Sequence, residues 1–447
     1  MKHLAIDIGA ESGRGMLGWI EDGRLCVDEI HRFPNAPLAE EDRLYWDIDH
    51  LLHEVNVAIA RAGGEIASVG IDTWAVDYVL LDSQGLRMER PRCYRDLRAA
   101  DVFGSTFKKV PVTEFYRQTG IQILPFNTVF QLLSDEPELL AKAASFLTIP
   151  DYLNFRLTGT RACEFTNATT TQCFDPTKND WAFDLLKQLG IPTGIFPPIN
   201  QPGTILGTVP QGSAKVVAVA AHDTGSAVAG TPLTPNSAWI SSGTWSIMGV
   251  EVPKPIINDN SLQANFTNEG GVSGTYRFSK NVAGLWLLQQ CRAAWGEGHS
   301  YDELCRLAEA VPSGETIDPD DPDFFAPGDM PDKINTKLSK PTEDKGQIVR
   351  IILDSLAQRY AEVLAKLEEL TATKLERVHV VGGGSRNWLL NQLTANACKR
   401  PVVAGPVEAT AIGNLLVQMI ALGQIASIEQ GRALVASSFS VKTFEPQ

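Results

Sequence analysis

Short apolar runs separated by glycine-containing turns open the chain. Residues 4–8, 15–20 and 25–33 form three such runs, joined by a turn at 9–13 and by Asp22-Gly23. Apolar runs of this length are typical of strands, and tight turns join antiparallel neighbours. The opening therefore predicts an antiparallel meander of three strands.

The pattern then alternates between the helical and the strand period. Apolar residues at helical spacing predict a helix over 46–62, and the apolar stretch 68–81 predicts a strand. Further predictions along the first half are a helical region over about 99–190, a proline-marked connection from 192 to 210, a buried strand at 215–221 and a helix at 225–230. Helices next to buried strands indicate an α/β layer.

Residues 238–250 repeat the order of the opening, strand, turn and strand, with the turn at Ser241 to Thr244. Such a repeat is expected of a duplicated core, and we place the boundary near Thr231, which gives domains at 1–231 and 232–447. The remaining predictions are a surface excursion over 311–345, a helix at 348–370, a strand at 378–381, a glycine turn at 382–384, and helices at 387–398 and 408–422.

Composition narrows the class of protein. With 447 residues, of which 44% are hydrophobic and 21% charged, the chain is globular and too long for one hydrophobic core. A net charge of -14 argues against nucleic acid and anionic membranes as partners. The seven cysteines form no C-x-x-C pair and are expected to be reduced, and no apolar run reaches the ~18 residues of a membrane span. We expect a cytoplasmic protein of unknown oligomeric state.

The first turn carries candidate chemistry. Asp7 ends a predicted buried strand, where a carboxylate could hold a hydrated magnesium ion. Gly9 and Gly13 let the backbone approach a ligand, Ser12 offers a hydroxyl, and Arg14 supplies positive charge. The pattern is that of a phosphate-binding turn; a hairpin with a solvated arginine is the alternative.

Two further turns could bind a nucleotide. Ser242-Gly243-Thr244 has no charge, but Gly382 to Gly384 lies between a predicted strand and a helix N-terminus, where amides and the helix dipole favour an anion. The G-x-G-x-x-G and G-K-[ST] spacings are missing, so neither a dinucleotide fold nor a P-loop is indicated.

Asp223 follows an apolar strand, at the edge where α/β sheets place reactive groups. A fixed carboxylate there could serve as the general base of a phosphoryl transfer, and a helix N-cap is the alternative role. His222 beside it is expected to be packed. Trp74, between Asp72 and Asp77, has the composition of a sugar site, or of a core indole with surface acids.

Ordered motifs along nearly the whole chain resemble the FGGY carbohydrate kinases, and within them the rhamnulokinases. They include D-I-G-A-E-S-G-R from Asp7, G-I-D-T-W-A-V-D from Gly70, A-H-D-T from Ala221, S-S-G-T-W-S from Ser241, T-N-E-G-G from Thr267 and V-V-G-G-G-S-R-N from Val380.

The resemblance implies two actin-like, ribonuclease-H-type α/β domains with a central interdomain cleft that binds ATP with Mg²⁺ and a ketose. By analogy Asp223 would be the base that activates the 1-hydroxyl of L-rhamnulose. Residues implied at the nucleotide are Ala10, Glu11, Ser12, Gly13, Arg14, Thr244, Gln289, Gly383 and Asn387. Residues implied at the sugar, besides Trp74 and Asp223, are Ala75, Asp77, His222, Thr224 and Asn281.

Two positions depart from the family pattern. Ala75 stands where glycine is usual, so its methyl group could narrow the sugar pocket, and Glu11 stands where serine is frequent. The nearest alternative is therefore a kinase for L-fuculose or another ketose. A non-catalytic actin-like ATP-binding regulator is the alternative from another class.

Overall fold

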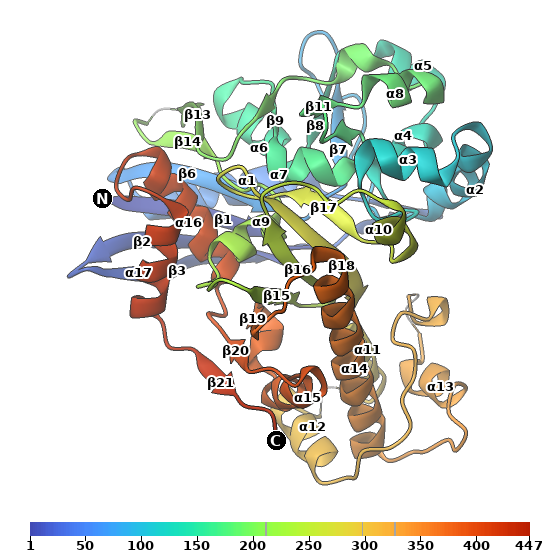
Figure 1. Cartoon of the computed structure of the whole chain (residues 1–447). Helices are drawn as coiled ribbons and strands as arrows, with labels where there is room; N and C mark the ends of the chain where they lie inside the picture. Colours follow the sequence, from blue (N-terminus) through green and yellow to red (C-terminus); the bar gives the residue numbers. More distant parts are fainter. Residues whose placement is uncertain (211, 297, 326–327) are drawn as a thin grey trace. The chain divides into compact units, whose positions relative to one another are not determined.

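The computed structural model describes residues 1–447 except 211, 297 and 326–327. The chain forms two compact units, each assembled from three segments (Figure 1). The first unit contains Met1–Pro232, Glu251–Phe278 and Thr410–Ser438, and the second contains Leu233–Val250, Ser279–Ala409 and Phe439–Gln447.

The first unit is built on a six-stranded sheet. Its strands run in the order β13-β14-β6-β1-β2-β3, with bounds β13 Thr204–Thr208, β14 Lys215–Ala218, β6 Ile66–Thr73, β1 Lys2–Ile8, β2 Ser12–Glu21 and β3 Arg24–Pro34. Strands β1, β2 and β3 are antiparallel neighbours, so the predicted meander is confirmed. Strand β1 is parallel to β6, and β6 to β14. Both faces of β1 are buried, which explains its nearly continuous apolar run.

Helices α1 (Ile48–Ala62) and α16 (Ala409–Ala421) lie against this sheet. Glycines in β2 make room for both: a Cβ at Gly15 would lie 3.1 Å from Cβ of Ala58 in α1, and one at Gly18 would lie 2.4 Å from Cδ1 of Leu415 in α16. In α16, Gln418 Nε2 donates to the carbonyl of Leu4 at 2.9 Å. The close approach of the helices to β2 thus depends on glycine, which has no side chain, at these two positions.

The predicted helical region holds most of the remaining helices of this unit, interrupted by short strands. The helices are α2 Ala100–Lys109, α3 Val112–Thr119, α4 Thr128–Ser134, α5 Pro137–Lys142, α6 Ile149–Thr158, α7 Phe165–Ala168, α8 Phe183–Leu189, α9 Asp223–Ala229, α10 Asp259–Gln263 and α17 Ile428–Ser438. The short strands are β4 Leu38–Glu40, β5 Arg43–Tyr45, β7 Tyr78–Leu81, β8 Ser145–Thr148, β9 Cys163–Glu164, β10 Phe174–Asp175, β11 Asp180–Trp181 and β12 Ile199–Asn200. Three-residue 3₁₀ helices occupy Leu97–Ala99, Thr169–Thr171 and Thr193–Ile195.

The prediction of one strand over 68–81 is wrong, because the chain turns between β6 and β7. Val76 has a φ of 68°, a left-handed conformation that a β-branched residue rarely adopts. Thr128 Oγ1 donates to the carbonyl of Val76 at 2.6 Å and holds this turn. An apolar run alone does not reveal such a break.

A second sheet has the strand order β17-β18-β16-β15-β19-β20-β21. Strands β15, β19, β20 and β21 belong to the second unit. The bounds are β17 Thr267–Gly270, β18 Tyr276–Ala283, β16 Trp245–Val252, β15 Ser237–Ser242, β19 Arg377–Val381, β20 Val402–Ala404 and β21 Lys442–Phe444. Strand β15 is antiparallel to β16 and parallel to β19, as β1 is antiparallel to β2 and parallel to β6. This repeated pairing agrees with a duplicated core.

The helices of the second unit are α11 Trp286–Ala294, α12 Tyr301–Glu309, α13 Met330–Asn335, α14 Lys345–Thr371 and α15 Trp388–Cys398, with 3₁₀ helices at Pro322–Phe324 and Gly383–Arg386. The predicted excursion over 311–345 therefore contains a helix that the sequence did not indicate. Met330 and Ile334 are fully buried and Phe324 is 1% exposed, so this segment is anchored by apolar side chains. Two of its residues, 326 and 327, lie outside the described part.

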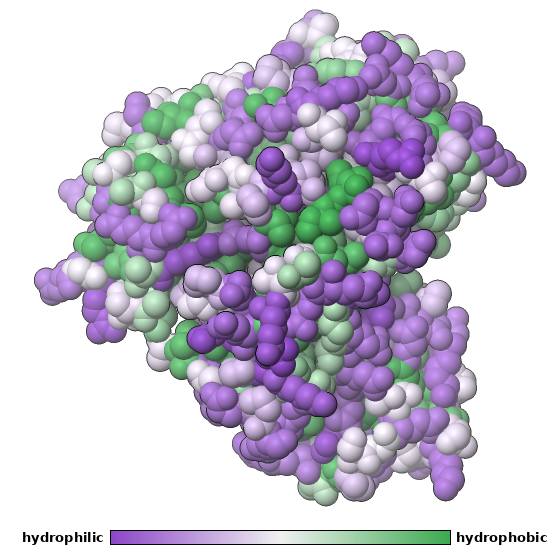
Figure 2. Space-filling model, viewed as in Figure 1, coloured by the Kyte–Doolittle hydropathy of each residue, from purple (hydrophilic) through white to green (hydrophobic). Residues whose placement is uncertain are grey.

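Hydrophilic residues cover most of the face seen in Figure 2, and hydrophobic residues show there in separate groups. Within the described part of the chain, no helix has the length and apolar character needed to cross a membrane. All seven cysteines are free thiols, as expected, and only Cys26 is not buried.

Candidate functional site

The turn between β1 and β2 is held from behind by an asparagine. Gly9 N donates to the carbonyl of Ser12 at 2.9 Å, and Asn35 Nδ2 donates to the carbonyl of Gly9 at 2.8 Å. The backbone amide of Asn35 also donates to the carbonyl of Glu11 at 3.0 Å. The carbonyls of the turn are thus engaged by protein, while Ala10, Glu11 and Ser12 are partly or fully exposed. Asn35 was missed in the sequence because it lies outside the motif.

Asp7 and Arg14, predicted to face metal and phosphate, form an ion pair with each other. They are register partners in β1 and β2, and Arg14 Nη2 and Nε lie 2.7 and 3.0 Å from Asp7 Oδ2. Oδ1 of Asp7 makes no hydrogen bond within the described part of the chain. One carboxylate oxygen is therefore open to a hydrated cation.

A magnesium ion would be held here through water rather than by a cage of side chains. Among the described residues, no group of three or more His, Cys, Asp or Glu side chains is placed to hold a metal directly. Asp72 lies beside Asp7 in the parallel register, is fully buried, and accepts from Asn414 Nδ2 at 2.6 Å. Burial, with Asp7 adding to it, raises the pKa of Asp72 well above its ordinary value. A hydrated ion fits the open oxygen of Asp7.

Asp223 is the first residue of α9, and one of its two oxygens is anchored. Thr224 N and Oγ1 lie 2.5 and 3.1 Å from Asp223 Oδ1, and Nε2 of the buried His222 lies 3.4 Å from the same oxygen. Oδ2 has no hydrogen-bond partner in the described part of the chain. The N-cap of α9 is His222, so the alternative role of Asp223 as N-cap is not observed.

The environment of Asp223 favours a stronger base. Burial, partly offset by His222, raises the pKa of its carboxyl above the ordinary value. The side chain is still 32% exposed, so a ligand could reach it. A fixed carboxylate with one unpartnered oxygen and a raised pKa has the properties of a general base.

The segment Trp74 to Asp77 is mostly part of the core. Asp77 Oδ2 accepts from Trp46 Nε1 at 2.6 Å, Trp74 Nε1 at 2.9 Å and Tyr94 N at 3.1 Å, and Oδ1 accepts from Gln131 Nε2 at 2.9 Å. Burial raises the pKa of Asp77 to about 6.

The indole ring of Trp74 is 6% exposed and packs on Trp46 with ring centroids 4.2 Å apart. These contacts favour the structural alternative for both Trp74 and Asp77. Ala75 is the partly exposed residue of the segment, so it is the one that remains able to face a ligand.

In the second unit, the turn after β15 and the glycine turn after β19 lie together. A Cβ at Gly384 would lie 2.0 Å from Ser242 Oγ, and one at Gly382, whose φ is 80°, would lie 2.8 Å from the Ser242 carbonyl. A Cβ at Gly383 would meet no atom within 4 Å, and this residue is exposed. Gly382 and Gly384 therefore serve packing, while Gly383 is open to a ligand.

Helix α11 starts against the same turn. Leu285 N donates to the carbonyl of Gly243 at 2.9 Å, and Trp286 N to that of Thr244 at 3.2 Å. A Cβ at Gly284 would lie 2.6 Å from the Thr244 carbonyl, so only glycine allows this approach. The structure thus brings the start of the helix that carries Gln289 to the turn of Thr244.

Three predicted residues remain in the second unit. Gln289 Oε1 is buried and has no hydrogen-bond partner among the described residues, so it is available as an acceptor. Asn281 is partly buried near the end of β18. Asn387 is the N-cap of α15: its Oδ1 accepts from Leu390 N at 3.0 Å and lies 3.3 Å from Cys305 Sγ. The capping role alone thus explains why an asparagine stands at position 387, without a contact to a ligand.

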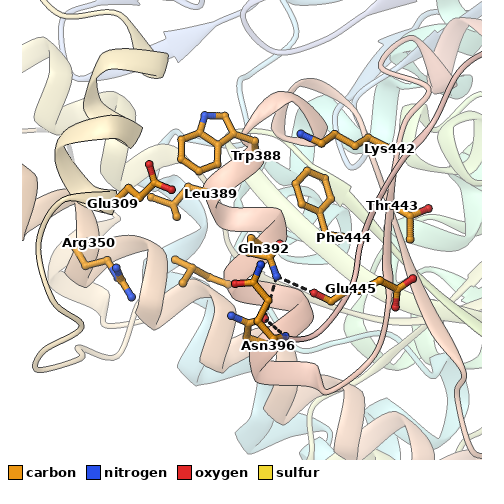
Figure 3. Close-up of a pocket in the computed structure, with 12 residues that line it drawn as sticks. Glu309, Arg350, Trp388, Leu389, Gln392, Asn396, Lys442, Thr443, Phe444 and Glu445 are labelled. Carbon is orange, nitrogen blue, oxygen red and sulfur yellow. Dashed lines mark hydrogen bonds between the residues drawn. The ribbon is translucent and has the colours of Figure 1, made fainter.

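A separate cavity of about 530 Å³ lies between α15 and the C-terminal strand (Figure 3). Gln392 Nε2 donates to the carbonyl of Glu445 at 2.8 Å across it, and Trp388, Phe444, Arg350 and Glu309 contribute to its lining. None of the predicted site residues lines this cavity. We therefore do not assign the chemistry to it.

The chain matches two family descriptions that together cover most of its length. Residues 3–230 match the N-terminal domain, and residues 238–422 the C-terminal domain, of the FGGY family of carbohydrate kinases. A rhamnulokinase of Bacteroides thetaiotaomicron is 43% identical over 465 residues, which cover 99% of this chain and 96% of the relative. A rhamnulokinase of Enterococcus faecalis is 41% identical over 464 residues, covering 99% and 94%.

Solved structures of sugar kinases share the fold. A ligand-bound xylulose kinase from Lactobacillus acidophilus superposes with a TM-score of 0.85 at 17% identity, covering all of this chain and 94% of that one. Glycerol kinase from Plasmodium falciparum with ADP gives 0.79 at 15% identity, with coverage of 100% and 94%. The two-domain α/β fold implied by the sequence motifs is confirmed.

Proposed function

Because the chain belongs to the FGGY family of carbohydrate kinases, we propose that it transfers the terminal phosphoryl group of ATP to the 1-hydroxyl of L-rhamnulose in rhamnose catabolism. The observation that carries the proposal is the identity of 39–43% with rhamnulokinases over nearly their full length. A carbohydrate kinase of this kind would work in the cytoplasm.

Asp223 is the proposed general base. Its free Oδ2 accepts the proton of the sugar's 1-hydroxyl as the hydroxyl oxygen forms a bond to the γ-phosphorus of ATP. The bond between the γ-phosphorus and the β,γ-bridging oxygen breaks at the same time, which releases ADP. The anchoring of Oδ1 by Thr224 and the one-third exposure of the side chain support this role. A non-catalytic ATP-binding regulator would not need such a base.

The nucleotide is proposed to contact the turn Ala10–Arg14 and, in the second unit, Thr244, Gln289 and Gly383. The exposure of residues in the first turn and of Gly383 supports this assignment, since an acidic protein must hold phosphate with local amides. Asp7 is proposed to hold Mg²⁺ through water, and the ion would neutralise charge on the phosphates when bound. Arg14 would keep its contacts with Oδ2 of Asp7, since the hydrated cation would bind at Oδ1.

The sugar is proposed to lie against Ala75, His222, Thr224 and Asn281. Asp77 accepts hydrogen bonds from four protein donors, which include the indole groups of Trp46 and Trp74. Its proposed role is to hold these two rings in place beside the sugar. Because the methyl group of Ala75 could narrow the sugar pocket, L-fuculose or another ketose is the alternative substrate.

The test is an ADP-release assay coupled to NADH oxidation, with L-rhamnulose, L-fuculose, L-ribulose, L-xylulose and glycerol compared at equal concentrations. We expect the highest kcat/KM with L-rhamnulose and little ADP release without sugar. A higher kcat/KM with another ketose would replace the substrate but keep the reaction class. ATP binding with no ADP formed from any sugar would refute the kinase assignment.

A further inference from the structure

A buried cluster of charge lies behind the proposed base, in the first unit. Arg277 of β18 is fully buried, and Glu269 of β17 and His222 are each 5% exposed. Glu269 lies in the T-N-E-G-G motif, but neither Arg277 nor Glu269 is among the site residues that the family resemblance implies. Burying an ion pair costs desolvation free energy that mutual attraction alone often does not recover, so the pair calls for a role other than stability.

Arg277 contacts the nitrogen of His222 that faces away from Asp223. Its Nη2 lies 3.0 Å from His222 Nδ1, and its Nε donates to the carbonyl of Gly270 at 2.8 Å, which fixes the guanidinium plane. A guanidinium only donates hydrogen bonds. Nδ1 must therefore present its lone pair, and the proton of a neutral imidazole lies on Nε2.

Nε2 of His222 faces Oδ1 of Asp223 at 3.4 Å. With its proton on Nε2, the imidazole attracts Oδ1, which also accepts from Thr224. The amide and hydroxyl of Thr224 and Nε2 of His222 thus hold Oδ1 of Asp223 and leave Oδ2 free. The opposite tautomer would point a lone pair at the carboxylate and repel it.

Glu269 forms an ion pair with Arg277, and its negative charge makes the arginine necessary for the tautomer of His222. Its Oε2 lies 3.2 Å from Arg277 Nη1 and 3.3 Å from His222 Nδ1. Burial acts against the charge of Glu269, but the charge of Arg277 lowers its pKa, so it is a carboxylate. Without Arg277, this carboxylate would attract a proton onto Nδ1 and reverse the tautomer.

We propose that Arg277 and Glu269 are positioning residues for phosphoryl transfer, which hold His222 in the Nε2–H tautomer and thereby aim Asp223. This inference rests on the proposed function, because it assumes that Asp223 is the base. It assigns no contact with sugar or nucleotide to either residue.

The first experiment removes Arg277. In Arg277→Met we expect kcat to fall by about 10- to 100-fold, by analogy with the loss of the partners that orient metal-binding histidines. KM for ATP should stay within about twofold, because no nucleotide contact is altered. The assay uses whichever ketose the unmodified protein phosphorylates fastest, so an error in the sugar assignment does not affect the test.

A double variant separates positioning from folding. Replacing a buried ion pair by apolar residues is often neutral or stabilising, so Arg277→Met/Glu269→Met should melt near the unmodified protein. Without Glu269, no carboxylate draws a proton onto Nδ1, and Asp223 Oδ1, 3.4 Å from Nε2, attracts the proton to Nε2. We therefore expect kcat of the double variant to recover most of the loss seen in Arg277→Met, with the His222 proton back on Nε2. A double variant that melts near the unmodified protein but keeps the full loss in kcat would overturn the proposal.

The matched control is Arg98→Met, which breaks another buried ion pair of the first unit, with Asp135. We expect a lower melting temperature and an unchanged kcat at temperatures where the variant is folded. A drop in kcat as large as that of Arg277→Met would indicate a general effect of buried charge.

The tautomer itself is measured by ¹⁵N-¹H correlation NMR of the imidazole rings, with the His222 signals assigned from their loss in His222→Gln. The proposal requires a proton on Nε2 only, and its transfer to Nδ1 in Arg277→Met. An Nδ1–H or doubly protonated ring in the unmodified protein would refute the inference. This readout needs no activity, so it fails independently of the proposed function.

Discussion

Replacing Asp223 by asparagine tests the proposed base with little change in structure. Asparagine keeps an oxygen at the position of Oδ1, where it can still accept from Thr224 N and Oγ1 and face His222 Nε2. The amide nitrogen would replace Oδ2, which has no protein partner to lose. We therefore expect the free energy of unfolding to change by less than about 1 kcal/mol.

The expected loss of activity is much larger. A positioned general base contributes about 10²- to 10⁴-fold to a rate, and each factor of ten corresponds to about 1.36 kcal/mol, so the barrier should rise by about 3 to 5 kcal/mol. If Asp223 acted only on the start of α9, asparagine would serve as well and the rate would hardly change. The two roles therefore differ by at least two orders of magnitude in kcat.

The assay is coupled ADP release at saturating L-rhamnulose and ATP, with ATP affinity measured by calorimetry and folding by thermal denaturation. ATP affinity should stay within about threefold, because Asp223 lies outside the proposed nucleotide contacts. Retention of more than about one-third of kcat would remove Asp223 from the mechanism. A melting temperature far below that of the unmodified protein would show instead that the carboxylate is structural.

Three further predictions follow from the geometry. Gly384→Ala should lower the free energy of unfolding by about 1–3 kcal/mol, since its Cβ would lie 2.0 Å from a buried hydroxyl, whereas Gly383→Ala, with no atom within 4 Å, should leave stability unchanged and raise KM for ATP; an unaltered KM would argue against nucleotide contact there. Ala75→Gly should shift the ratio of kcat/KM between L-rhamnulose and L-fuculose while ATP affinity stays constant, and identical ratios would show that Ala75 is passive. Burial raises the pKa of Glu164 to about 8 and of Asp151 to about 7. Both groups take up protons on folding, so their contribution to stability is full below about pH 4 and is lost as the pH rises towards 8. Urea denaturation between pH 5 and 9 should show a smaller pH-dependent loss in Glu164→Gln than in the unmodified protein; equal slopes would contradict these pKa values.

Features encoded by short-range pattern could be predicted from the sequence. The meander of β1 to β3 follows from apolar runs and tight turns, and the place of Asp223 follows from the strand before it. The turn after β6 could not be predicted, because the apolar run continues through it and the break depends on Thr128 and Gln131, which lie more than 50 positions further along.

Partners distant in sequence limited the prediction of the site. From the sequence, Asp77 is interpreted as a sugar-binding acid. In the structure its hydrogen-bond donors come from Trp46, Tyr94 and Gln131, which no local sequence pattern connects. Arg277 and Glu269 were missed for the same reason, since an arginine and an acid near a strand usually lie at the surface. The motif T-N-E-G-G contained Glu269, yet only tertiary contact with His222 gives it a role.

Helix α16 has a consequence for how the protein is made. It belongs to the first unit through Thr410–Ser438, and its Asn414 and Gln418 donate to the carbonyls of Gly70 and Leu4 in the central strands. These strands leave the ribosome more than 300 residues before the helix that covers them. The nascent chain must therefore carry an uncovered sheet face while more than 300 further residues are made, and the first unit reaches its final form only after α16 has left the ribosome.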